Sequence, residues 1–212
     1  MNSWYLTFRN NWSEALEEKN FLMRFTINAV VCTSLYMAMV HFLAWNRLTP
    51  GVILNDPIQK FFVPRDFSTI IFSITYSCAI LFIIYIIARP RDFYYVARAF
   101  LVVFLLRGVF IVLIPLVPPT DTVPLHDPFL DFLVGENKDI LNDLFYSGHM
   151  ADLCIFFLCC RSVALKSFTF LSAIAVAIML VWQHVHYTAD VIGAPFFAYV
   201  CYALFVKGKW QE

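Results

Sequence analysis

Six long apolar runs dominate the chain, and their length decides what it can fold into. They cover Phe25–Trp45, Thr69–Ile87, Ala99–Val117, Tyr146 to about Leu165, Phe168 to about Val185, and about Ala189 to Val206. A helix needs about 20 consecutive apolar residues to cross the hydrocarbon core of a bilayer. Backbone polar groups inside a bilayer must be paired within the protein, which favours helices for runs of this length. We therefore predict an all-α, polytopic membrane protein with a six-transmembrane-helix bundle.

The composition excludes an ordinary soluble domain. Of the 212 residues, 61% are hydrophobic and only 14% are charged, whereas a soluble domain carries about 25% charged residues. The formal net charge is zero, so no nucleic-acid partner is predicted. The pattern divides the chain into an amphipathic N-terminal arm at 1–24, a six-helix membrane domain at 25–206 and a cytoplasmic tail at 207–212.

The basic residues predict the orientation of this bundle, because cytoplasmic loops carry an excess of Lys and Arg. If both termini are cytoplasmic, the inner segments hold Arg9, Lys19, Arg24, Arg89, Arg91, Arg98, Arg161, Lys166, Lys207 and Lys209. The outer loops then hold only Arg47, Lys60, Arg65 and Lys138. We therefore expect cytoplasmic termini, and the polar segments that end at His149 and Asp190 should lie at the outer face.

The segment His-Val-His-Tyr-Thr-Ala-Asp, which ends at Asp190, offers an activated imidazole. His186 and Asp190 are four residues apart, so they share a face on a continuous helix. If the chain instead turns at Thr188, the carboxylate can still reach back to the ring. A carboxylate that accepts from one ring nitrogen leaves the other nitrogen as a lone pair. His186 is therefore a candidate nucleophile or base.

The segment Asn-Asp-Leu-Phe-Tyr-Ser-Gly-His ends at His149, where the fourth membrane helix should begin. The free N–H groups and the dipole at a helix start attract anions, and Gly148 lets a ligand approach the backbone closely. Ser147 and Gly148 are therefore predicted to form a phosphate site, with His149 as a proton donor. Asp152, about one turn further on, either orients His149 or makes a hydrogen bond between helices.

Three of the five histidines gather in these two segments, which favours a functional site because ionisable groups are costly in a membrane. Zinc held by His184, His186 and Asp190 is a competing interpretation. However, His184 and His186 would point apart on a helix, and a metal would compete with the phosphate site. We therefore predict neither a metal nor an organic cofactor.

Together the two segments resemble the active-site motifs of the sphingomyelin synthase family, within the type 2 phosphatidic acid phosphatase superfamily. The resemblance covers Asp143, Ser147-Gly148-His149, His184, His186-Tyr187-Thr188, Asp190 and Val191. The stretch from Leu106-Arg107 to Pro118 is similar to that family's arginine-and-proline segment, although its proline spacing is shorter. Met150 and Val185 depart from the usual threonine and acidic residue, which leaves the head group open.

The resemblance implies an enzyme that moves a phospho-head group between lipids at the outer (exoplasmic, luminal or periplasmic) face. In the implied catalytic trio, His186 attacks the phosphorus, Asp190 orients it, and His149 protonates the departing diacylglycerol. The donor would be phosphatidylcholine or phosphatidylethanolamine, and the acceptor ceramide or a diacylglycerol-like lipid. The implied phosphate-binding residues are Ser147, Gly148, Arg107 and Tyr187. The implied supporting residues are Asp143, Asp152 and His184.

Alternatives remain at this stage. A lipid phosphate phosphatase would use the same trio with water as the acceptor, but its nearly dianionic substrate favours several cations. Met179 and Leu180 stand where that class usually carries a Ser-Arg pair, so a phosphodiester donor is favoured. Arg107 lies in mid-span and either contacts phosphate or pairs with an acid such as Asp152 or Asp190. A channel or scaffold lined by these polar residues is the non-enzymatic alternative.

Overall fold

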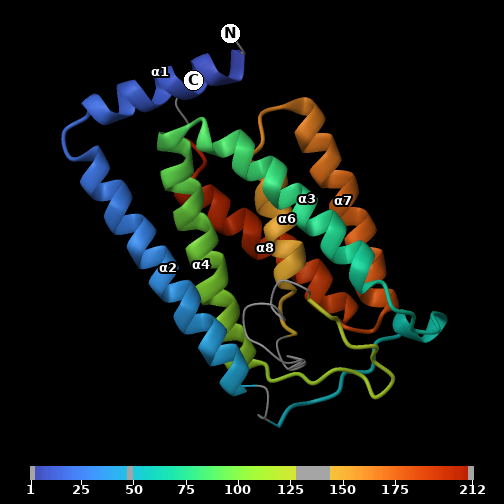
Figure 1. Cartoon of the computed structure of the whole chain (residues 1–212). Coiled ribbons are helices and arrows are strands. Elements are labelled where there is room, and N and C mark those ends of the chain that lie inside the picture. Colours follow the sequence, from blue (N-terminus) through green and yellow to red (C-terminus); the bar gives the residue numbers. More distant parts are fainter. Residues whose placement is uncertain (1–2, 47–49, 128–143, 210–212) are drawn as a thin grey trace.

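The computed structural model describes residues 3–46, 50–127 and 144–209, and these residues are overwhelmingly helical. Figure 1 shows the helices in chain order: α1 (Ser3–Glu17), α2 (Phe21–Asn46), η1 (Gln59–Phe61), α3 (Ser68–Ile87), α4 (Pro90–Leu113), α6 (Gly148–Cys159), α7 (Val163–Trp182) and α8 (Thr188–Phe205). Pairing of β type within these ranges is limited to one isolated bridge between Val52 and Leu116.

Five of these helices, namely α2, α3, α4, α7 and α8, are long and apolar enough to cross a membrane. The prediction of an α-helical membrane protein is therefore confirmed. Helix α6 differs from the expected run of Tyr146 to about Leu165, because it has only 12 residues and so a length of about 18 Å. The chain is extended at Cys160 and again at Ser162, and Arg161 between them donates its N–H to the Tyr85 hydroxyl at 3.0 Å.

Helix α4 also departs from the sequence prediction, because it begins at Pro90 and ends at Leu113 rather than covering Ala99–Val117. Proline suits the first turn of a helix, where its missing N–H removes no hydrogen bond. Beyond Leu113 the chain contains Pro115, which cannot continue the helical ladder. The carbonyl of Pro115 instead accepts the N–H of Val52 at 2.8 Å, which joins two loops at one end of the bundle.

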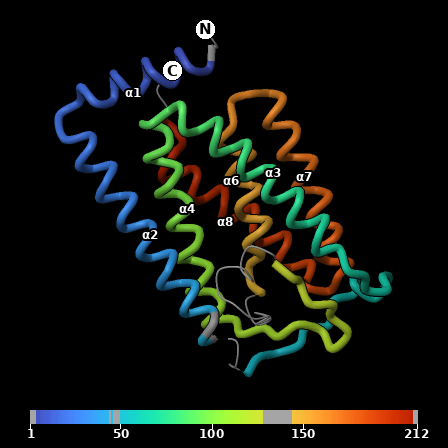
Figure 2. Tube along the Cα trace, viewed as in Figure 1, coloured from blue at the N-terminus to red at the C-terminus, as the bar shows by residue number. Residues whose placement is uncertain are grey.

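The bundle is built around α6, which packs against α3, α4, α7 and α8, whereas α2 packs mainly against α1 and α4 (Figure 2). Small residues permit close contact between helices in a membrane. Ala151 of α6 and both Ala194 and Ala198 of α8 are fully buried. Helices α6 and α8 therefore pack closely on each other, and the two histidine motifs lie at the starts of these helices.

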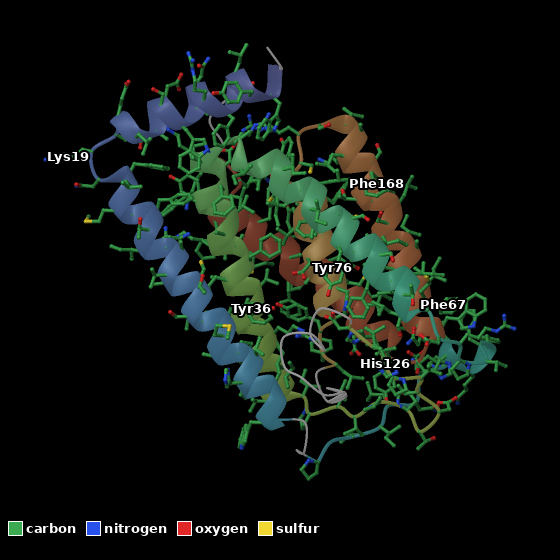
Figure 3. All side chains as sticks on the ribbon, viewed as in Figure 1. Lys19, Tyr36, Phe67, Tyr76, His126 and Phe168 are labelled. Atoms are coloured by element: carbon green, nitrogen blue, oxygen red, sulfur yellow. The ribbon has the colours of Figure 1, made fainter. Side chains whose placement is uncertain are left out.

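The two ends of the bundle differ. At the end that we call the loop end lie residues 50–67, 114–127, 144–147 and 183–187, and Figure 3 shows Phe67 and His126 there. At the opposite end, which we call the arm end, α1 crosses the bundle, and Lys19 marks the elbow between α1 and α2. The last residues of α8 lie at the arm end as well, since Lys209 stacks over Tyr95 near the start of α4.

The arm α1 completes the hydrogen bonding of α3. The last four carbonyls of a helix have no partner inside the helix. Trp4 Nε1 donates to the carbonyl of Ile84 at 3.2 Å, and Trp12 Nε1 donates to that of Ile87 at 2.8 Å. Asn11 Nδ2 donates to the carbonyl of Ala88 at 2.8 Å. The arm is thus attached to the bundle by directional bonds.

Replacing Trp12 with Phe keeps most of the apolar surface but removes the indole donor. We expect the variant to lose about 0.5–1.5 kcal/mol of stability, the usual contribution of one such hydrogen bond. Thermal unfolding in detergent measures this loss. Trp45→Phe is the control, because Trp45 is 74% exposed on α2; equal shifts in the two variants would contradict the assigned role of α1.

Candidate functional site

Asp190 is placed by the start of α8. Tyr187 is the residue before the first helical turn, and its N–H donates to Asp190 Oδ2 at 2.9 Å. A carboxylate three residues into a helix commonly closes back on the residue that precedes the helix. The side chain of Asp190 is fully buried, so this local bond holds the carboxylate at a defined position inside the bundle.

His186 lies beside this carboxylate although the two do not share a continuous helix, because α8 begins at Thr188 and Asp190 reaches back to the ring. Its Nδ1 atom is 3.5 Å from Asp190 Oδ2, and the ring is buried. The distance is within ion-pair range but longer than an ordinary hydrogen bond. The backbone of His186 is fixed separately, because Gln59 Nε2 donates to its carbonyl at 3.1 Å.

The two motifs meet through Ser147. Its backbone N–H donates to the carbonyl of Asp190 at 3.2 Å, so the start of α6 is bonded to the first turn of α8. Ser147 is fully buried and immediately precedes Gly148, the first residue of α6. The predicted phosphate site and the predicted nucleophile are therefore adjacent.

Arg107 reaches the same place from α4. Its Nε donates to the carbonyl of Tyr146 at 2.9 Å, and the side chain is buried. A Cβ atom at Gly148 would lie 3.2 Å from the guanidinium carbon, which is tighter than ordinary van der Waals contact. Glycine at 148 thus lets the guanidinium group lie against the start of α6.

His149 and Asp152 occupy the next turn of α6, and both are half-buried. The His149 ring packs edge-on against Phe72 of α3, with ring centroids 5.4 Å apart. Asp152 lines a cavity of about 230 Å³ between α2, α4 and α6, together with Arg107 and Gly148. Of the two predicted acidic partners of Arg107, Asp152 is therefore the one that shares a cavity with it.

Three buried polar atoms cluster around Asp190 without a hydrogen-bond partner among the residues that the structure describes. They are Ser147 Oγ, His186 Nδ1 and Asp190 Oδ1. Buried polar atoms are nearly always paired in proteins, so each exception needs an explanation. A cluster of donors and acceptors at the junction of two motifs is typical of a site that binds a polar ligand.

The side chains of His184 and Tyr187 contact the two loops at residues 50–67 and 114–127. The His184 ring lies 3.1 Å from Asp121 Oδ2 on one side and 3.1 Å from the carbonyl of Gln59 on the other. The Tyr187 hydroxyl donates to the carbonyl of Val117 and accepts the N–H of Leu54. Tyr187 therefore already uses its hydroxyl within the protein, and its predicted contact with phosphate stays a prediction.

The remaining sequence predictions fall outside this geometry. Asp143 lies outside the described residues. Zinc held by His184, His186 and Asp190 is not supported, because the His184 ring faces Asp121 and Gln59. The described part of the chain contains no group of three His, Cys, Asp or Glu side chains able to hold a metal.

The sequence analysis missed three residues that shape the site. Gln59 donates from Nε2 to the carbonyl of His186, and its own carbonyl lies against the ring of His184. Gln183 is fully buried, and it accepts the N–H of Phe67 and donates to Ser68. Asp56 accepts the N–H of Thr188, the first residue of α8, at 2.6 Å. A polar residue at the end of an apolar run, such as Gln183, could have been predicted to have a structural role. No sequence pattern connects Asp56 or Gln59 to α8.

Asp56 also provides a pH-dependent contact. Burial alone would raise the pKa of Asp56, but hydrogen bonds from the N–H groups of Thr188, Ile58 and Gln59 outweigh it, so the pKa lies below its ordinary value. A lowered pKa means that the carboxylate stabilises the fold above about pH 4, the usual Asp value, and that this contribution is lost as the pH falls through the lower folded pKa.

We expect Asp56→Asn to lower stability at pH 7 by about 0.5–2 kcal/mol, the usual range for a lost helix cap. The difference from the unmodified protein should be smaller at pH 3, below the ordinary pKa of aspartate, because the unfolded state then binds a proton and the stabilising contribution decreases. Thermal unfolding at the two pH values tests this, with Asn55→Ser on the neighbouring exposed position as the control. A pH-independent difference would contradict the role of the ionised carboxylate.

No protein-family model, curated protein or solved structure that was compared with the chain matches it. The similarity to sphingomyelin synthases therefore rests on the two motifs and on the residues around them. Membership of that family stays a prediction.

Proposed function

We propose that the chain is a membrane phosphotransferase that moves a phospho-head group from a glycerophospholipid to ceramide or a related lipid alcohol. The observation that carries this proposal is the buried contact between His186 Nδ1 and Asp190 Oδ2, which are 3.5 Å apart. The backbone carbonyl of Asp190 also accepts the N–H of Ser147, which joins this pair to the start of α6. A buried imidazole oriented by a carboxylate beside an anion-binding helix start is an arrangement suited to attack on phosphorus.

In the first step His186 attacks the phosphorus through Nε2 while Nδ1 faces Asp190. A nitrogen–phosphorus bond forms, the bond from phosphorus to the diacylglycerol oxygen breaks, and His149 gives that oxygen a proton. In the second step His149 takes the proton of the acceptor hydroxyl, whose oxygen attacks the phosphohistidine. The nitrogen–phosphorus bond then breaks, and the head group leaves on the new lipid.

The charges near the site favour a phosphodiester as the donor. The buried guanidinium group of Arg107 lies against Gly148, where it can neutralise a single negative charge. Lys60 and Arg65, the basic residues of the described 50–67 loop, are both exposed. A phosphomonoester carries nearly two charges and favours several arginine contacts, so hydrolysis of phosphatidic acid is the second candidate.

The proposal includes six membrane-crossing helices, both termini in the cytoplasm, and a site near the outer face. Helix α6 would be the sixth, with its short length placing His149 below the membrane surface. The ten basic residues assigned to the inner side lie on α1, in the arm-end connections between helices, in the first three turns of α2, α4 and α7, and just after α8. This distribution supports a cytoplasmic arm end.

A product assay decides between the two reactions. Purified protein in liposomes receives phosphatidylcholine, phosphatidylethanolamine and phosphatidic acid with ceramide, and mass spectrometry identifies the products. We expect diacylglycerol together with a ceramide that carries the donor's head group. Release of inorganic phosphate from phosphatidic acid, without a new phospholipid, would establish the phosphatase instead.

Substitution of the three proposed catalytic residues tests the mechanism. His186→Ala should abolish turnover and phosphate trapping, and His149→Ala should lower the rate by about 10²–10⁴-fold, the usual contribution of a general acid or base. Asp190→Asn should keep the bond from the Tyr187 N–H but lower kcat.

His41→Ala is the matched control, because His41 is exposed on α2 and its ring contacts the carbonyl of Met37 on the same helix. It should retain full activity. Unchanged function in His186→Ala would show that the chain is a scaffold or channel, and a phosphorylated His186 in the wild type would exclude that alternative.

A further inference from the structure

A second cavity lies towards the arm end, away from the histidine motifs. It has a volume of about 400 Å³ and lies between α2, α4 and α8. Its polar lining consists of Arg24, Asn28, Tyr94 and Arg98, and its apolar lining consists of Ile27, Val31, Leu101, Val102 and Phe205. None of these residues belongs to the candidate catalytic site.

The lining changes from polar to apolar along the helices. On α4, Tyr94 and Arg98 come first from the arm end, and Leu101 and Val102 follow about one turn deeper. On α2, Arg24 is nearest the elbow, and Val31 lies about two turns deeper. This gradient follows the axis of a membrane lipid, whose charged head lies at the surface and whose chains point towards the bilayer centre.

The polar end of the cavity is positively charged. Arg98 is exposed, and its guanidinium carbon lies 4.9 Å from the centroid of the Tyr94 ring. Within the described ranges it makes no ion pair with a carboxylate. Arg24 lies 3.5 Å from Glu18, but Glu18 also bonds Arg91 at 2.5 Å. Arg91 also lies 3.7 Å from Glu14. The three arginines Arg24, Arg91 and Arg98 thus lie near two carboxylates, so the cluster keeps an excess of positive charge.

We propose that this cavity binds an acidic glycerophospholipid from the membrane leaflet at the arm end. Its phosphate lies between Arg24 and Arg98, and the first part of one acyl chain lies along Val31, Leu101 and Val102. Arginine is suited to phosphate because its planar N–H groups match the phosphate oxygens. The apolar depth of the cavity favours a lipid over a free phosphate ester.

The position of the cavity gives the bound lipid a structural consequence. Helix α2 packs mainly on α4 and α1, and the cavity lies on its side facing α4 and α8. A lipid held there contacts all three helices and stabilises the folded state by mass action. This binding is independent of the phosphotransfer chemistry at the loop end.

The test uses the full chain, purified in detergent and titrated with dioleoylphosphatidylglycerol or dioleoylphosphatidylcholine. Native mass spectrometry counts retained lipids, and thermal unfolding measures the shift. We expect phosphatidylglycerol to be retained and to raise the Tm more than phosphatidylcholine does. Arg98→Gln should weaken its retention by about tenfold, as expected for the loss of a charge-assisted hydrogen bond, and Arg98→Lys should restore part of it.

Arg9→Gln is the matched control, because it removes the same charge from an exposed position of α1 outside the cavity. An equal loss in Arg9→Gln would overturn the site and leave only general attraction to acidic lipids. Equal retention of the two lipids by the wild type would overturn it too, as would binding of sn-glycerol 3-phosphate as strong as that of phosphatidylglycerol.

A second pair of variants tests the apolar part without a change of charge. Leu101→Trp fills the cavity and should also reduce retention of phosphatidylglycerol, whereas Ile80→Trp on the exposed face of α3 should not. Unchanged retention in Leu101→Trp would contradict the placement of the acyl chain. This pair decides the question if Arg98→Gln does not fold.

Discussion

The geometry of the site depends on one buried carboxylate. An ionised group in an apolar interior is costly unless polar partners surround it. Asp190 has the N–H of Tyr187 on one side-chain oxygen and the imidazole of His186 near the same atom, while its backbone carbonyl accepts the N–H of Ser147. One residue thus ends the loop before α8, orients the imidazole and attaches α6. The two histidine motifs are held together by the same residue that would serve the chemistry.

The loops around this carboxylate are ordered by polar side chains that satisfy buried backbone groups. Gln183 bonds the backbone at Phe67, Val123 and Pro124, which belong to two different loops. Tyr187 connects Leu54 with Val117 in the same way. Buried backbone groups are almost always paired, so these loops can approach the membrane-embedded site only because such side chains are present. These hydrogen bonds therefore hold the loops in a defined arrangement around His186.

The sequence predicted the parts of this arrangement that depend on local pattern. Apolar length identified the membrane helices. The short separation of His186 and Asp190 predicted their contact, which the turn before α8 produces rather than a shared helix face. The start of α4 at Pro90 was missed because residues 90–98 are mostly charged or aromatic, and the shortness of α6 was missed because the apolar run continues past it. Asp56 was missed for a different reason: it is 132 residues from Thr188, and no local pattern encodes such a contact.

Arg107 shows how a buried positive charge is held at the site. It lies in the last two turns of α4, towards the loop end of the bundle. Its Nε donates to the carbonyl of Tyr146, and a hydrogen bond to a charged group contributes about 1.5–3 kcal/mol. Asp152 lines the same cavity, and the absence of a side chain at Gly148 brings the guanidinium group against the start of α6. The fold therefore places a positive charge beside a helix start that adjoins a buried imidazole, which is the arrangement that the proposed phosphodiester chemistry requires.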